Sequence, residues 1–281
     1  MLEALRAVND ADEIDAIRAA AVLADEALEE VLAGGIVGRT ERDVALALEL
    51  EIAIRRRGAE GVSFFRRDSA YGGKTGIDLP EAKNYVGAYH QPASVLVDPG
   101  VLSTLSAEEV AAGYAEVVKT ALIAGGALWE EVRSGADPTS EEVILGCLRT
   151  KLAAVAADER DHGRRQVLNL GHTVGHALEA ATGYRRLRHG EAVALGLLCA
   201  LRLSRQAELR DEVASLLRAR GLSERLEGVD PGEVVALVER DKKRRGGSVP
   251  FVLVEAPGEV SPGHAIAEAE LRAAIEEAVV A

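Results

Sequence analysis

Residues 168–179 read LNLGHTVGHALE and place His172 and His176 four residues apart on one predicted helix. Side chains at positions i and i+4 share a helix face, so both rings point the same way, and Glu179 lies near that face. A third histidine, His189, opens the next predicted helix after a short polar loop. Half of the six histidines of this chain therefore fall in one predicted helical hairpin.

This hairpin has the features of a metal site. The loop is short enough to return His189 to the side of His172, and Gly171 and Gly175 leave room for a close approach. Two imidazoles from adjacent helices, joined by one carboxylate, leave an open position on a divalent metal, as in catalytic zinc sites. Capping or surface histidines are the alternative for a bare pair, but the third histidine and the glycines favour the metal.

The carboxylate has to come from another segment, and Glu116 is the candidate. It lies in the predicted helix AGYAEVVKTALI, with Lys119 one turn further on. Such a pair is either a half-buried functional pair or part of a solvent-facing stripe. The pattern alone favours the stripe, because charged side chains are rarely buried.

The composition limits the classes of function. The formal net charge is −13, which argues against nucleic acid and against anionic membranes as partners. Cys147 and Cys199 lie in apolar helical patterns and are predicted to be buried free thiols, which is typical of a reducing compartment. The first residues lack the pattern of a signal peptide, and the longest apolar run, AVALGLLCAL, is about half of a membrane span. We therefore expect a soluble cytoplasmic protein.

Apolar periodicity and capping residues predict a mainly helical chain. The segments GVSFF and SVLVD are predicted strands, DSAYGGKTGIDLPEAKN is predicted to be a loop, and PFVLVEAPGEV a strand or hairpin. The predicted helices cover about 12–33, 40–57, 106–124, 127–133, 139–157, 171–182, 190–206, 210–219, 231–240 and 267–280.

Several basic or amide residues outside the histidine helix could bind an anion. GGKTG, residues 72–76, is a loop in which backbone N–H groups and Lys74 could hold a phosphate, although Asp68 stands where a P-loop would have its first glycine. Arg165 and Asn169 come just before the histidine helix. The run DKKRRGG is basic in an acidic chain, and its alternative is a solvated turn. Each signal is weak alone.

Taken together and in order, these segments resemble 3-dehydroquinate synthase. The resemblance rests on DSAYGGKTGIDLPEAKNYVGAYHQP, AEVVKTALI, LNLGHTVGHALE, HGEAVALG and DKK…FVL, and it runs from Asp68 to near the C-terminus. It implies a sugar-phosphate cyclase of the shikimate pathway, and so of aromatic amino acid biosynthesis, a lyase that converts 3-deoxy-D-arabino-heptulosonate 7-phosphate into 3-dehydroquinate and phosphate. It implies NAD, which takes and returns a hydride, and a divalent metal, zinc or cobalt.

The same resemblance implies roles for individual residues. The metal ligands fall on Glu116, His172 and His189. The positions that match the catalytic and substrate pocket are Lys74, Asn84, Lys119, Lys151, Arg165, Asn169, His176 and one of Lys242 and Lys243. The positions that match contacts to NAD are Asp68, Lys74, Lys83 and Thr104.

The chain departs from this family before Asp68. The family carries a long N-terminal α/β domain with most of its NAD site, and no GxGxxG turn or strand–helix alternation precedes Asp68. Residues 12–64 instead resemble the first two helices of the Xaa-Pro dipeptidase catalytic domain, a pita-bread metallopeptidase, and stop before its metal ligands, so we transfer no peptidase function. The junction between the dipeptidase-like and the synthase-like segments is either a natural fusion or an artefact of sequence assembly. We expect such a chain to bind metal with little or no turnover.

The fold class expected is therefore mainly α. We predict a helical hairpin at 1–67, a short α/β remnant of the NAD-binding domain at 68–104, and a helical metal- and substrate-binding domain at 105–281. Another sugar-phosphate cyclase, a glycerol-dehydrogenase-like enzyme and a non-catalytic truncated fusion are the alternative functions. The expected partner is a small sugar phosphate, and a homodimer is possible.

Overall fold

The computed structural model of this chain describes residues 33, 74–79, 82–89, 99–159, 161, 163–244 and 250–280, with the backbone alone for 74–89, 101 and 241–244. Two compact units emerge, Met1–Pro92 and Ala93–Ala281. The predicted helices at 12–33 and 40–57 and the strands GVSFF and SVLVD lie outside the described residues, Ala33 excepted.

The first unit contains an antiparallel hairpin of β1 (Lys74–Leu79) and β2 (Ala82–Tyr89). Lys74 pairs with Tyr89 and Ile77 with Val86, and the register shifts near the turn. The prediction of a loop through this stretch was wrong. Glycines and polar residues resemble a loop locally, but strand formation depends on the partner strand more than on propensity.

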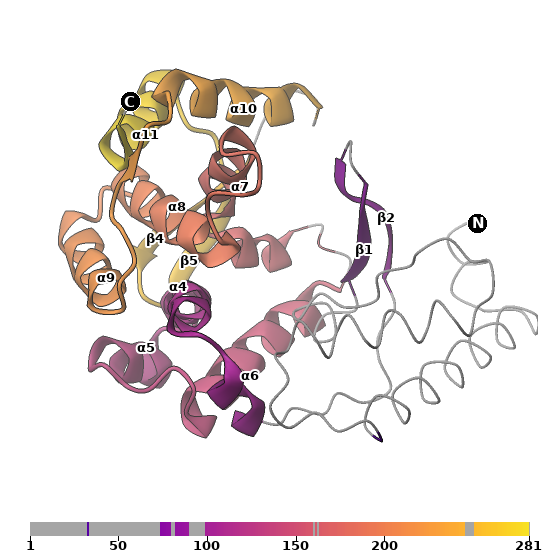
Figure 1. Cartoon of the computed structure of the whole chain (residues 1–281), viewed down its shortest axis with the longest axis vertical. Helices are drawn as coiled ribbons and strands as arrows, with labels where there is room; N and C mark the ends of the chain where they lie inside the picture. The colour runs from indigo at the N-terminus through magenta and orange to yellow at the C-terminus, as the bar shows by residue number, and fades with distance from the viewer. Residues whose placement is uncertain are drawn as a thin grey trace, which may run out of the picture. The chain divides into compact units, whose positions relative to one another are not determined.

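The second unit is mainly helical, which confirms the predicted fold class (Figure 1). Its helices and strands are η1 (Pro99–Thr104), α4 (Ala107–Ala124), α5 (Gly126–Arg133), α6 (Glu141–Ala157), η2 (Arg164–Asn169), α7 (His172–Ala181), α8 (His189–Leu203), α9 (Ala207–Ala219), β3 (Leu226–Glu227), α10 (Pro231–Arg244), β4 (Phe251–Ala256), β5 (Glu259–His264), α11 (Glu268–Ala278) and β6 (Val279–Val280).

Local signals set the helix boundaries close to those predicted. Ser106 caps α4 by accepting a hydrogen bond from the backbone N–H of Glu109, and Ser140 caps α6 in the same way. The segment predicted as a strand or hairpin near residue 250 is the antiparallel pair β4–β5. The short strands β3 and β6 pair in parallel.

Helix α8 forms the centre of this unit. Eleven of its residues are buried, at Gly190 and continuously from Ala192 to Leu201. A helix that is apolar all round must be enclosed by other elements, and α8 packs against α4, α7, α9, α11 and β4 (Figure 1). Two apolar clusters form on its opposite sides, one with α4 and α9 and the other with α7, α10 and α11. Among the described helices, none is both long and apolar enough to span a membrane.

The two cysteines give a direct test of this core. Both are free; Cys199 is buried on α8, and Cys147 is half-buried on α6. Burial raises the pKa of Cys199 to about 12 and that of Cys147 to about 11. Because only the thiolate reacts, we expect both thiols in the folded protein to react with Ellman's reagent at pH 8 at least ~100-fold more slowly than in guanidinium. Fast reaction of Cys199 in the folded protein would contradict this packing.

Candidate metal centre

Glycines at the start of α7 bring the histidine helix against α8. Gly171 has φ +76° at the N-cap, and a Cβ there would lie 2.9 Å from the backbone nitrogen of Leu197. A Cβ on Gly196 would lie 2.0 Å from the carbonyl oxygen of Gly171. The two backbones therefore approach too closely for a side chain. This confirms the predicted close approach and places His172 beside α8.

The start of α8 is held against α4 in the same way. A Cβ on Gly190 would lie 1.8 Å from the carbonyl oxygen of Ala112, so the backbones of α8 and α4 are in contact. Arg188 donates from Nε to Oε1 of Glu109 on α4 at 2.9 Å, and its backbone N–H donates to Glu191. His189, between Arg188 and Gly190, is thereby fixed next to α4.

These contacts bring together the three predicted metal ligands. Oε1 of Glu116 lies 3.6 Å from Nε2 of His172 and 3.6 Å from Nε2 of His189. The ring centroids of the two histidines are 5.2 Å apart. Ligand atoms at ~2.0–2.1 Å from a tetrahedral zinc ion are about 3.4 Å from one another. Both carboxylate-to-imidazole distances are therefore close to what one such ion requires, and all three ligand atoms lie within 4.8 Å of one another.

The protonation states also suit a metal. Nδ1 of His172 lies 3.1 Å from the carbonyl oxygen of Leu170, which can only accept, so Nδ1 donates and Nε2 keeps its lone pair. Burial, with the nearby charge of Lys119, lowers the pKa of His172 to about 3. Burial alone would raise the pKa of Glu116, but the charge and hydrogen bond of Lys119, together with His172 and His189, outweigh it and the pKa is about 2. At neutral pH the site holds a neutral ring and a carboxylate, as metal ligands must be.

The residues present fit a divalent cation. Oε1 of Glu116 is buried and has no hydrogen-bond partner among the described residues. It faces the lone pair of His172 Nε2, so two acceptors point at each other with no proton between them. A cation between them removes this repulsion. Two imidazoles and one carboxylate form the donor set of a catalytic zinc site with an open position.

Lys119 completes the arrangement around Glu116. Its Nζ lies 2.5 Å from Oε2 of Glu116, and its side chain is 8% exposed. The pattern-based interpretation of Glu116 and Lys119 as a solvent-facing stripe was therefore wrong. By holding Oε2, Lys119 leaves Oε1 directed at the histidines.

Glu179 is a site residue that the prediction left out of its ligand and pocket set. Its side chain is 7% exposed, and Oε1 lies 3.4 Å from Nδ1 of His189. A carboxylate on the outer nitrogen of a histidine commonly orients the ring toward a metal. The signal was present in the sequence, because Glu179 follows His172 by seven residues and so lies on the same helix face.

This contact predicts that Glu179→Gln lowers zinc affinity by about 10–100-fold, because His189 loses its orienting charge. Competition with a chromophoric chelator measures the affinity. Glu142→Gln, an exposed change on α6, is the matched control. Equal affinities for both variants would contradict an orienting role.

The structure also describes the side chains of further predicted site residues of the helical unit. Arg165 is buried on η2 and donates to the carbonyl oxygen of Glu159 at 2.7 Å. His176 is exposed on α7, with its ring centroid 5.3 Å from that of His172. Lys151 is partly buried on α6, and Thr104 is exposed at the end of η1.

The remaining predicted residues have no described side chain. Lys74 begins β1, and Lys83 and Asn84 lie on β2 in the first unit. Lys242 and Lys243 lie in α10, within a helix and not in the solvated turn considered for this run. Asp68 lies outside the described residues.

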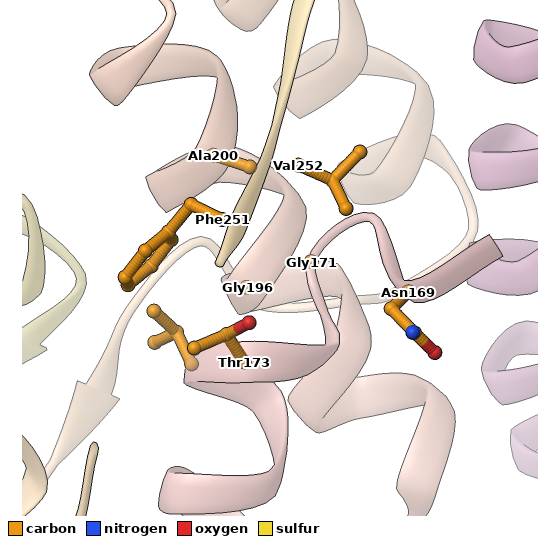
Figure 2. A pocket seen from close by; sticks show the side chains of 8 residues that line it. Asn169, Gly171, Thr173, Gly196, Ala200, Phe251 and Val252 are labelled. Carbon is orange, nitrogen blue, oxygen red and sulfur yellow. The ribbon is translucent and has the colours of Figure 1, made fainter. Parts of the chain in front are cut away.

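A small pocket adjoins the start of the histidine helix (Figure 2). Gly171 and Thr173 of this segment face Ala200 of α8 and Phe251 of β4. Asn169 lies at its edge and is exposed. Its lining is mostly apolar, and Asn169 is the predicted site residue among the lining residues.

The fold of this chain is shared with solved structures of two synthases that contain NAD⁺ and a divalent metal ion. A 2-epi-5-epi-valiolone synthase from Streptomyces hygroscopicus, with NAD⁺ and Zn²⁺ bound, aligns with a TM-score of 0.68 at 23% identity, covering 90% of this chain and 77% of that chain. A 2-deoxy-scyllo-inosose synthase complexed with carbaglucose-6-phosphate, NAD⁺ and Co²⁺ aligns at 0.66 with 21% identity, covering 91% and 78%.

Sequence comparison identifies the particular family, and the chain belongs to the 3-dehydroquinate synthases. Residues 113–244 match the 3-dehydroquinate synthase C-terminal family and residues 59–112 the N-terminal family. The synthase of Agrobacterium fabrum is 38% identical over 288 residues, covering 94% of this chain and 74% of its own length. That of Symbiobacterium thermophilum is 44% identical over 207 residues, covering 69% and 58%, and that of Nitrobacter winogradskyi 41% over 254 residues, covering 81% and 64%.

These matches confirm the predicted resemblance to the synthase. The chain spans about 58–74% of the length of these relatives. The match to the Agrobacterium synthase covers 94% of the chain and so extends into residues 1–67. The resemblance of residues 12–64 to dipeptidases stays a prediction.

Proposed function

We propose that this chain carries the metal- and substrate-binding part of a 3-dehydroquinate synthase, which forms 3-dehydroquinate and phosphate from 3-deoxy-D-arabino-heptulosonate 7-phosphate. The observation that supports this best is the convergence of Glu116, His172 and His189 from three helices. Relatives that are 37–44% identical and are named for this activity support the choice of substrate.

The residues around the centre fit an anionic, hydroxyl-bearing substrate. Glu116, His172 and His189 would hold a divalent metal, zinc or cobalt, and NAD would take and return a hydride while the metal polarises a substrate hydroxyl. The exposed ring of His176 lies beside the proposed ligands, where it can exchange a proton with bound substrate. Asn169 offers an amide at the edge of the same region.

Two cations would anchor the phosphate or hydroxyl groups. Lys151 and Arg165 would supply positive charge in a chain with a net charge of −13, and cations held at the site would select for an anion. Lys74, Asn84 and one of Lys242 and Lys243 would join them. Asp68, Lys74, Lys83 and Thr104 would contact NAD.

The same proposal extends to the localisation, the partners and the domain boundaries of the chain. We infer a cytoplasmic enzyme that acts on a free sugar phosphate, with no nucleic-acid or membrane partner. Residues 1–67, 68–104 and 105–281 would be its three segments, with the last as the metal- and substrate-binding domain.

The experiment combines binding and turnover in one sample. NAD is titrated calorimetrically into the zinc-loaded protein, and phosphate release from the heptulosonate phosphate is then followed. Saturable NAD binding with zinc-dependent phosphate release supports the proposal, and His172→Ala serves as the inactive control. Phosphate release equal in wild type and His172→Ala, or equal zinc binding by the two proteins, would contradict it. Zinc binding without release would match the little or no turnover expected from the sequence.

A further inference from the structure

A second group of metal-binding side chains lies on the outer side of the same helical hairpin. His176, Glu179 and His189 each offer one ligand atom, and these atoms lie within 4.8 Å of one another. The first group, Glu116, His172 and His189, meets the same criterion. Among the described residues, His189 is thus common to two sets of donors.

The two sets use His189 from opposite sides of its ring. Nε2 lies 3.6 Å from Oε1 of Glu116, whereas Nδ1 lies 3.4 Å from Oε1 of Glu179. A separation of 3.4 Å matches the ~3.4 Å between two ligands on a tetrahedral zinc ion. The ring of His176 lies 5.9 Å from that of His189, centroid to centroid, with an interplanar angle of 29°. The three ligand atoms therefore lie within 4.8 Å of one another, with Oε1 of Glu179 beside Nδ1 of His189.

The chemistry of the second set suits a cation that arrives from solvent. It consists of two imidazoles and one carboxylate, which is again a zinc-type donor set. His176 and the His189 side chain are exposed, so the position is accessible, whereas Glu179 is buried and cannot swing away. A buried carboxylate that faces two exposed rings distinguishes this cluster from ordinary surface histidines.

We propose that His176, Glu179 and His189 form a second divalent-cation site, weaker than the first, with His189 bridging the two ions. An ion bound there takes the position of the hydrogen on Nδ1, and the proton is released to solvent. Affinity at the second site is lower because the shared ring already donates to the first ion. Filling it also takes Glu179 away from its orienting role, so excess metal would perturb the first site.

Equilibrium dialysis of untagged protein against increasing zinc, with metal quantified by mass spectrometry, tests this directly. Wild type is expected to bind a first equivalent tightly and a second at zinc concentrations at least ~10-fold higher. His176→Ala should keep the first and lose the second. His172→Ala should lose the tight equivalent and keep a weak one. His264→Ala, a change on β5, should bind as wild type does.

Either of two results would overturn the proposal: saturation of wild type at one equivalent, or two equivalents retained by His176→Ala. Because His176 is exposed, its substitution is expected to leave the fold intact, and circular dichroism checks that each variant is folded. Because the readout is metal content, the result is independent of whether the chain turns over substrate.

Discussion

His172→Ala is expected to lower zinc affinity by at least about 100-fold, the largest effect on binding of any substitution outside Glu116 and His189. Zinc sites contribute roughly 10–16 kcal/mol in total, so one of three protein ligands supplies about 3 kcal/mol or more. The ring of His172 is 14% exposed and its Nε2 lies 3.6 Å from Oε1 of Glu116, so its loss leaves that carboxylate oxygen facing one imidazole in place of two. Chelator competition at pH 7 measures the change.

The matched control is His264→Ala. His264 lies on β5, with Nε2 2.8 Å from Oγ of Ser261, outside both donor sets. The substitution His264→Ala removes an imidazole from the same protein but leaves the proposed ligands unchanged. If His264→Ala weakens zinc binding as much as His172→Ala, the metal is bound elsewhere.

Gly190→Ala is expected to destabilise the fold by about 3 kcal/mol or more, and to weaken zinc binding with it. The added Cβ would lie 1.8 Å from the carbonyl oxygen and 2.4 Å from the carbonyl carbon of Ala112. These are backbone atoms, so α4 and α8 must separate. His189 precedes Gly190 directly, so the separation moves a proposed ligand away from Glu116. Urea unfolding followed by circular dichroism measures the loss.

Gly113→Ala is the control on the facing helix. Gly113 follows Ala112 directly in α4, is exposed, and has nothing within 4 Å of the position where a Cβ would be added. Alanine there should stabilise the helix by roughly 0.5–1 kcal/mol, because glycine is a poor helix former. A Gly190→Ala protein as stable as wild type would show that the helices do not pack so closely.

Much of the helical unit could be predicted from the sequence because its signals are local. Serines at positions 106 and 140 cap helices, and apolar periodicity marks the helices between them. The apolar pattern around Cys199 in α8 also predicted that this thiol is free and buried, as it is. The hairpin at 74–89 was missed, because the pairing of β1 with β2 depends on residues up to fifteen positions apart, Lys74 and Tyr89.

For the candidate site, too, the features set by local sequence could be predicted, and those set by packing could not. The spacing of His172 and His176, with His189 beyond a short loop, is sufficient to predict that their rings converge, and ring centroids 5.2–5.9 Å apart agree. The burial of Lys119 was not predictable from its own helix, because it depends on which elements cover that face. The second donor set was not predictable either, because only the folded hairpin brings Nδ1 of His189 to Glu179.

The central claim is that Glu116, His172 and His189 bind one divalent ion. Anomalous diffraction at the zinc edge, from crystals grown with one equivalent of zinc, tests it most directly. We predict a single strong peak within ~2.0–2.2 Å of Oε1 of Glu116 and of Nε2 of both histidines. A zinc peak elsewhere, with none between these three atoms, would contradict the account.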